Sequence, residues 1–109
     1  MTNVTSIRGD TFVRSYKLVD TFTRLPINLT NHIVKSHFRN TAGALILDAT
    51  QLITVDAEDG LITLVVPAPI TKALNLGSYL FDIEVTYPSG TVSTIEQVRL
   101  NLIEDYTYE

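Results

Sequence analysis

The chain has 109 residues, a mass of 12.1 kDa, no cysteine and a formal net charge of −4. The lack of cysteine excludes disulfide bridges, thiol nucleophiles and cysteine-ligated zinc sites. An acidic chain without a clustered basic stripe is a poor nucleic-acid binder, and no apolar run approaches the roughly 18 residues of a membrane span. No signal peptide is visible at the start, so we expect a protein made and kept in cytoplasm or assembled from it.

Composition favours an all-β fold, because valine, isoleucine and threonine account for 35 residues and Cβ-branched side chains suit a pleated surface.

Charge is uneven along the chain. Residues 1–40 hold six Lys/Arg against two acids, whereas residues 41–109 hold two Lys/Arg against ten acids. If the fold separates these sets on different faces, one copy can dock its acidic surface on the basic surface of the next. If the fold interleaves them, the split is only a fact about chain order.

The first predicted strand, over residues 11–19, alternates in polarity. Its apolar face holds Phe12, Tyr16 and Leu18. Arg14 interrupts that face, so it either reaches the rim of the sheet or pairs with a carboxylate. Residues 25–31 contain Pro26, which cannot donate to a central ladder, and we expect this stretch to cross between sheets in an extended conformation.

The second predicted strand covers residues 32–39, and its inner face holds Val34, Ser36 and Phe38. The other face displays a basic stripe to solvent, made of Lys35, His37 and Arg39. A turn at residues 40–43 leads into a partner strand over residues 44–48.

Residues 52–55 and 61–66 form the next predicted hairpin. The five-residue acidic loop between them ends in Gly60, which is placed to take a positive φ. The apolar spacing of residues 70–76 indicates one or two helical turns that cross from one sheet to the other, with Gly77 as the C-cap.

The last hairpin gives the strongest signal, because residues 79–87 alternate strictly in polarity. Pro88-Ser89-Gly90 then turns the chain. Residues 91–103 are too long for one flat strand, so we expect a bend or bulge at residues 95–97. The inner face of this last strand is predicted to begin with Val92 and Thr94.

Together these elements predict an all-β fold: an immunoglobulin- or fibronectin-III-like β-sandwich of about seven strands, with one short helical turn before the final hairpin. An up-and-down barrel is the alternative. Residues 1–109 are expected to form a single domain, with residues 104–109 as a polar tail.

Few residue patterns indicate chemistry. His32 and His37 are five positions apart on one predicted strand, so they face opposite sides and cannot share a metal ion from it. Asp82 and Glu84 face the same way but away from the apolar face, which favours a solvated surface or an interface rim over a catalytic carboxylate pair. No nucleophile, phosphate-loop or zinc-protease motif is present. No catalytic residue is therefore assigned, and no cofactor is expected.

Two short motifs have competing interpretations. Asp56, Glu58 and Asp59 resemble a calcium loop with oxygen ligands at alternate residues, but the closing glutamate of an EF-hand is missing. A plain acidic loop is favoured, and weak calcium binding is the alternative. Arg8-Gly9-Asp10 spells the tripeptide that integrins read, and we expect it to form the tight turn before the first core strand.

Several short segments, taken together in their order along the chain, form a further pattern. They are Arg8-Gly9-Asp10-Thr11-Phe12, Asp20, Pro26-Ile27-Asn28-Leu29-Thr30, residues 76–85, residues 90–94 and residues 105–107. In order and spacing they resemble a group of small structural domains of phage tails, which includes the N-terminal domain of phage baseplate upper proteins. The resemblance covers nearly the whole chain. The departures are Arg24 and Asn31, where the group has glycine, Asn28, where it has an acid, and Gln97, near a common glycine.

The resemblance implies an immunoglobulin-like sandwich that serves as a virion building block without catalytic residues. We therefore expect a non-enzymatic structural component of a tailed phage, in the tail, baseplate, neck or fibre attachment, that is made in the host bacterial cytoplasm and located in the virion. Its expected partners are other virion proteins and itself in a homo-oligomer, not nucleic acid, a membrane or a small-molecule substrate. The alternatives are an immunoglobulin-like capsid decoration protein and a calcium- or carbohydrate-binding adhesin module.

The candidate interface residues are the basic stripe, the acidic pair and two tail tyrosines: Lys35, His37, Arg39, Asp82, Glu84, Tyr106 and Tyr108. The chain lacks the long C-terminal extension of a baseplate upper protein, so we expect one stand-alone module that acts through its surfaces. We expect its edge strands to offer unpaired backbone groups and residues 104–109 to reach a neighbour, with a frayed terminus as the alternative.

Overall fold

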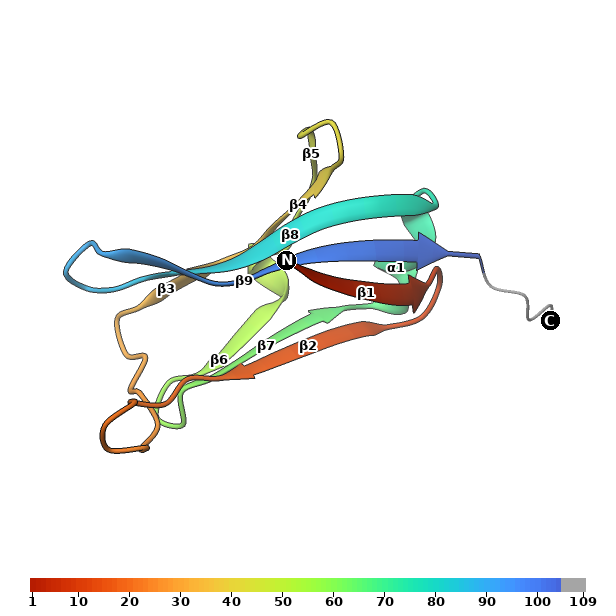
Figure 1. Cartoon of the computed structure of the whole chain (residues 1–109). Helices are drawn as coiled ribbons and strands as arrows, with labels where there is room; N and C mark the ends of the chain where they lie inside the picture. The colour runs from red at the N-terminus through yellow and green to blue at the C-terminus, as the bar shows by residue number, and fades with distance from the viewer. Residues whose placement is uncertain (105–109) are drawn as a thin grey trace.

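The computed structural model describes residues 1–104, which form two β-sheets packed face to face (Figure 1). The six-stranded sheet A has the order β1 (Thr2–Ile7), β9 (Val92–Ile103), β8 (Gly77–Thr86), β4 (His37–Asn40), β5 (Leu45–Asp48), and β3 (Ile33–Lys35) also pairs with β8. The three-stranded sheet B has the order β2 (Phe12–Lys17), β7 (Leu61–Val66), β6 (Ile53–Asp56). A 3-10 turn, η1 (Thr50–Leu52), precedes β6, and helix α1 (Ala68–Ala73) lies between β7 and β8.

The predicted immunoglobulin-like sandwich is confirmed. Sheet B corresponds to strands B, E and D of that fold, and β4, β8 and β9 correspond to strands C, F and G. Near the start of β8, the Tyr79 hydroxyl donates a hydrogen bond of 2.6 Å to the carbonyl oxygen of Asn75, which is the tyrosine corner of this fold. Because the described strands divide into two separate sheets, the barrel alternative is wrong.

The strand count is nine rather than about seven. The strand predicted over residues 32–39 is divided at Ser36 into β3 and β4, and His32 lies before β3. The other addition is β1, which runs parallel to β9 with Thr2 opposite Val98. Sequence pattern missed β1 because its inward side carries Thr2, Val4 and Ser6, with a single apolar residue among them.

Aromatic side chains from both sheets meet in the core. The ring of Phe81 on β8 stacks on Phe38 of β4, with centroids 4.4 Å apart. Phe12 of β2 meets Phe81 edge-on at 5.9 Å. Both geometries are favourable for aromatic pairs, so this trio joins sheet A to sheet B in the core.

The two predicted crossings between sheets are confirmed, since residues 18–32 lead from sheet B to sheet A and α1 does the same. The C-cap assignment is wrong. α1 ends at Ala73, Leu74 is already extended, and Gly77, with φ 136°, opens β8. No helix in residues 1–104 has the length and apolar character to cross a membrane.

The Arg8-Gly9-Asp10 segment forms the predicted tight turn, between β1 and β2. The amide of Asp10 donates to the carbonyl oxygen of Ile7 at 3.0 Å, and Gly9 has φ 97°. Thr71 of α1 holds the turn: its buried hydroxyl accepts from the Gly9 amide at 3.1 Å and donates to the Asp10 carbonyl at 2.7 Å. The tripeptide therefore has a structural role here.

The predicted bulge in the last hairpin is confirmed, and it changes which residues face inward. Ile83 pairs with Glu96 and Glu84 pairs with Thr94, so Ile95 is the extra residue. Because side chains alternate along a strand, one extra residue reverses their direction. Val92 and Thr94 are exposed, contrary to expectation, and Glu96 points into the gap between the sheets at their edge.

Candidate functional site

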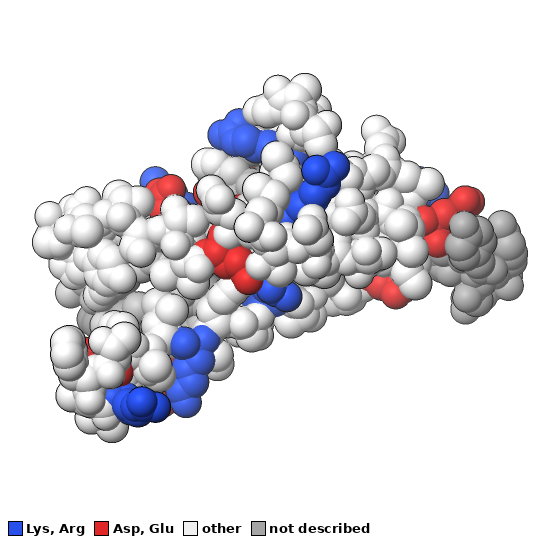
Figure 2. All heavy atoms as spheres, in the orientation of Figure 1, with Lys and Arg blue, Asp and Glu red and all other residues white. Residues whose placement is uncertain are grey.

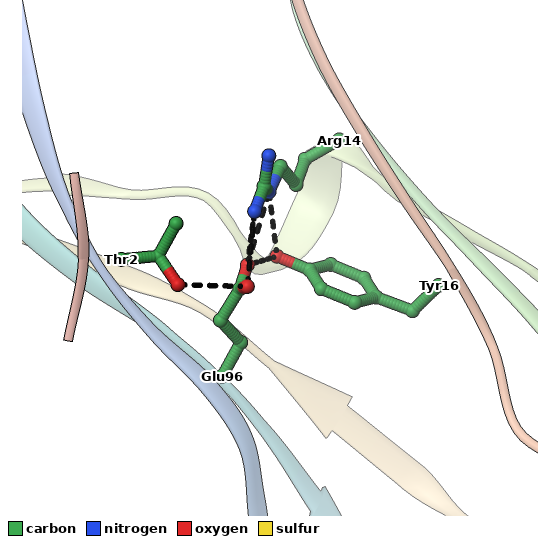
Figure 3. A network of polar contacts seen from close by, with 4 residues as sticks. All are labelled: Thr2, Arg14, Tyr16 and Glu96. Atoms are coloured by element: carbon green, nitrogen blue, oxygen red, sulfur yellow. Dashed lines mark hydrogen bonds and ion pairs between the residues drawn. The ribbon is translucent and has the colours of Figure 1, made fainter. Parts of the chain in front are cut away.

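A cluster of four polar side chains bridges the two sheets at one edge of the sandwich (Figure 3). Arg14 and Tyr16 come from β2 of sheet B, and Glu96 and Thr2 come from β9 and β1 of sheet A. Arg14 donates to the Glu96 carboxylate from Nε at 3.0 Å and from Nη2 at 2.9 Å. The hydroxyls of Tyr16 and Thr2 donate to the same carboxylate at 2.6 Å and 3.1 Å. The expectation that Arg14 either reaches the rim or pairs with a carboxylate is resolved in favour of the pair.

The charges of this cluster stabilise one another. Burial alone raises the pKa of Glu96, but the hydrogen bonds from Tyr16, Arg14 and Thr2 outweigh it and leave the pKa below its ordinary value. The hydrogen bonds with Tyr16 and Glu96 raise the pKa of Arg14. Burial and the bond to Glu96 raise the pKa of Tyr16 to about 12. The Tyr16 proton is therefore held firmly, and the cluster acts as a clasp between sheets rather than as a nucleophile with its base.

The clasp predicts a loss of stability in alkali. The Tyr16 pKa is about 12 in the folded protein and 10.0 ordinarily, so between these values the unfolded chain binds fewer protons. This contribution is complete below pH 10 and disappears as the pH rises toward 12. We expect the urea midpoint of the wild type to fall over that range, and that of Tyr16→Phe to fall less steeply. Tyr87→Phe is the matched control, and equal slopes for the wild type and Tyr16→Phe would contradict this assignment.

The interface residues predicted on strands all lie on the outer face of sheet A. Lys35 on β3 lies directly opposite Glu84 on β8, and Arg39 on β4 lies opposite Leu80 on β8. The basic and acidic stripes are therefore neighbours on one face. Figure 2 shows the same mixing over the visible surface, where Lys/Arg and Asp/Glu lie in small separate groups. The hypothesis that the two charge sets occupy different faces is wrong, because strand pairing interleaves them.

A shallow hollow of about 320 Å³ lies on this outer face. Among its lining residues are Met1, His37, Arg39, Leu80, Asp82 and Glu84. Between Lys or Arg and Asp or Glu, the ion pair found in residues 1–104 is Arg14–Glu96, and Nε2 of His37 lies 3.5 Å from Oδ1 of Asp48. The carboxylates of Asp82 and Glu84 are thus half-buried next to cations without forming an ion pair within this part of the chain.

The loop between β2 and β3 contains a turn at residues 20–25 that is fixed by hydrogen bonds. The Asp20 carboxylate accepts hydrogen bonds from the amides of Phe22 and Thr23, at 2.8 and 2.9 Å. The backbone of Asp20 also pairs with Leu25 and Arg24. Arg24 has φ 58°, in the left-handed region. These bonds fix the backbone of the turn that precedes the predicted crossing at residues 25–31.

This turn presents apolar side chains to solvent. Phe22 is 94% exposed, Leu25 63% and Val19 45%. The base of the loop is anchored by Gly60, whose carbonyl accepts from the Leu18 amide at 2.8 Å, and by the pairing of Ile27 with Leu18. We call Val19, Phe22 and Leu25 the apolar tip. Its signal in the sequence is weak, because a single phenylalanine among threonines has no periodicity.

The remaining candidates do not form a site. Asp56, Glu58 and Asp59 are exposed around the turn between β6 and β7, which is one residue shorter than predicted because Asp56 pairs with Leu61. Across residues 1–104, no three His, Asp or Glu side chains lie close enough to hold a metal ion.

The two histidines lie in different settings. His32 precedes β3 and packs edge-on against Tyr87 at 4.9 Å, whereas His37 on β4 lies beside Asp48. The tail tyrosines Tyr106 and Tyr108 lie outside the described residues.

Comparison with solved structures gives distant likenesses in fold. No family model matches the chain, and no curated protein matches it. CopC from Methylosinus trichosporium OB3b superposes with a TM-score of 0.46 and 16% identity, over 70% of this chain and 67% of that chain. Extracellular domains 3–5 of Drosophila OTK superpose with a TM-score of 0.42 and 14% identity, over 96% of this chain. The chain spans 33% of that structure, and neither likeness bears on function.

Proposed function

We propose that this protein is a non-enzymatic structural module of a tailed-phage virion, in the tail, baseplate, neck or fibre attachment, and that it works by protein–protein docking. The resemblance to small phage-tail domains supports the setting. At two of its departures, Arg24 and Asn31 stand where that group has glycine, and these are the two non-glycine residues with positive φ in residues 1–104. A glycine pattern that coincides with left-handed backbone positions supports the alignment of the segments.

The docking role is carried by the apolar tip. An aromatic side chain that is almost fully exposed loses apolar hydration only when another surface covers it, and aromatic residues dominate the binding energy of interfaces. The capped turn beneath Phe22 holds the loop in place before binding, which reduces the entropy lost on association. A loop with a hydrogen-bonded turn that leaves Phe22, Leu25 and Val19 exposed is therefore best explained as an anchor for a protein partner.

This function predicts that Phe22→Ser removes the protein from the particle without unfolding it. Purified virions of the phage that encodes the chain should contain the wild-type protein at many copies by mass spectrometry. The Phe22→Ser protein should be at least about tenfold depleted, since hot-spot aromatics contribute about 2 kcal/mol or more. Thr21→Ser, on the same turn, is the matched control. Virions without the wild-type protein would overturn the setting, and normal incorporation of Phe22→Ser would overturn the anchor.

A further inference from the structure

We propose that the outer face of sheet A binds a second copy of this chain, face to face across a two-fold axis parallel to the strands. The inference deepens the proposed docking function, and it uses a different surface from the apolar tip. A second copy is the expected occupant because the charges on this face are complementary to those of the same face on another copy.

The charges stand in two adjoining columns. One column, on β3 and β4, carries Lys35, His37 and Arg39. The next column, on β8, carries Asp82 and Glu84, with Glu84 directly opposite Lys35. A two-fold axis between the columns places the basic column of each copy over the acidic column of the other. Every contact then occurs twice, as a two-fold interface requires.

The acidic column lacks ion-pair partners in its own chain. Asp82 and Glu84 are half-buried in the hollow, yet neither forms an ion pair within residues 1–104. Lys35 and Arg39 are exposed and likewise form no ion pair there, and the Arg39 guanidinium donates a hydrogen bond of 3.2 Å to the carbonyl oxygen of Gly43. Lysine and arginine side chains from above can reach these carboxylates, because the hollow is open and shallow. Positive and negative charges are thus both available on this face. A face that carried charges of one sign only would repel a second copy of itself.

Apolar side chains border the columns and supply contact area that surface ion pairs alone do not provide. Met1 is 72% exposed and lines the hollow, Ile33 is 55% exposed beside Lys35, and Leu45 is 51% exposed opposite Arg39. Charge then sets the register of the two copies, and the apolar border stabilises the contact. This combination of apolar border and two-signed centre fits a second copy of the same face.

The test is charge reversal followed by mixing. In sedimentation at low salt the wild type should form a dimer that weakens as salt is added. Under the proposed two-fold axis Lys35→Glu places an acid over Glu84 of the other copy, and Glu84→Lys places a base over Lys35. Each variant alone should therefore dimerise at least about tenfold more weakly. An equimolar mixture of the two variants should restore a dimer, because positions 35 and 84 of the two copies then face each other with opposite charges. Pairing within one chain cannot produce this rescue.

Three measurements keep the outcome decisive. Melting temperatures close to that of the wild type show that both reversed variants are folded, and Lys17→Glu, on sheet B, should dimerise normally. A wild type that stays monomeric at millimolar concentration, or a mixture that stays monomeric, overturns the proposal. Phe22→Ser should still dimerise, so failure of this interface and failure of the apolar tip are separate results.

Discussion

Gly60→Ala should lower the free energy of unfolding by about 3 kcal/mol, since overpacking against fixed atoms and a left-handed non-glycine residue each add to the loss. Gly60 is buried with φ 63°, and a Cβ there would lie 2.6 Å from the Leu18 carbonyl oxygen and 2.8 Å from that of Ile27. Both neighbours are backbone atoms, which cannot move aside as a side chain can. The clash therefore has to displace the two segments that flank the apolar tip.

Substitution of a second glycine measures the loss of stability from backbone strain without a steric clash. Gly43 has φ 89°, but nothing lies within 4 Å of its Cβ position. Gly43→Ala should therefore lose only about 1 kcal/mol, the strain of the left-handed conformation alone. Urea unfolding of both variants measures the difference, and equal losses would show that the base of the loop yields to a methyl group. Gly60→Ala should also weaken docking through Phe22, because Leu18 and Ile27 position that loop.

The second large effect is expected at the clasp. Glu96→Ala removes the acceptor of Arg14, Tyr16 and Thr2 together, and leaves Arg14, whose side chain is 28% exposed, without its counter-ion. Leaving polar groups and a charge unpaired costs more than the pair itself contributes. We expect a loss of about 2 kcal/mol in unfolding free energy, below the range for fully buried pairs because water reaches this edge. Gln97→Ala, at the next, exposed position, is the control and should be nearly neutral.

The pH dependence of that loss has a definite sign. The pKa of Glu96 is lower in the folded protein than its ordinary value, so the unfolded chain binds more protons as the pH falls. The contribution of Glu96 is present above the unfolded pKa and is lost as the pH falls through the folded one. The stability curves of the wild type and Glu96→Ala should therefore converge in acid. A gap that stays constant down to pH 2 would assign the loss to packing alone.

Local pattern was sufficient for most of the framework. The seven predicted strands, the crossing helix, the bulge and the positive φ of Gly60 follow from period-two alternation, proline and glycine placement, and chain length, which act within a few residues. The error in the inner face of the last strand arose where one extra residue reverses the direction of the side chains. At the bulge, Ile95 reverses the strand and exposes Val92 and Thr94. A period-two pattern can indicate that a strand contains a bulge. It is less able to locate the residue at which the inward and outward faces exchange.

The candidate surfaces depended more on tertiary structure. Sequence singled out Lys35, Glu84 and their neighbours as exposed charges, but only the pairing of β3 with β8 shows that they adjoin. The apolar tip was missed because exposure of Phe22 is a property of the folded loop.

By itself, the sequence determined a two-sheet β-sandwich without cysteine chemistry and identified its turns. Tertiary structure decided that Arg14 meets Glu96, that β1 joins β9, and that the charge split along the chain becomes a mixed face. The physical reason is how far apart in the sequence the interacting residues lie. Turn and strand preferences arise from neighbouring residues, whereas these contacts join residues that are distant in the chain and that only strand register brings together.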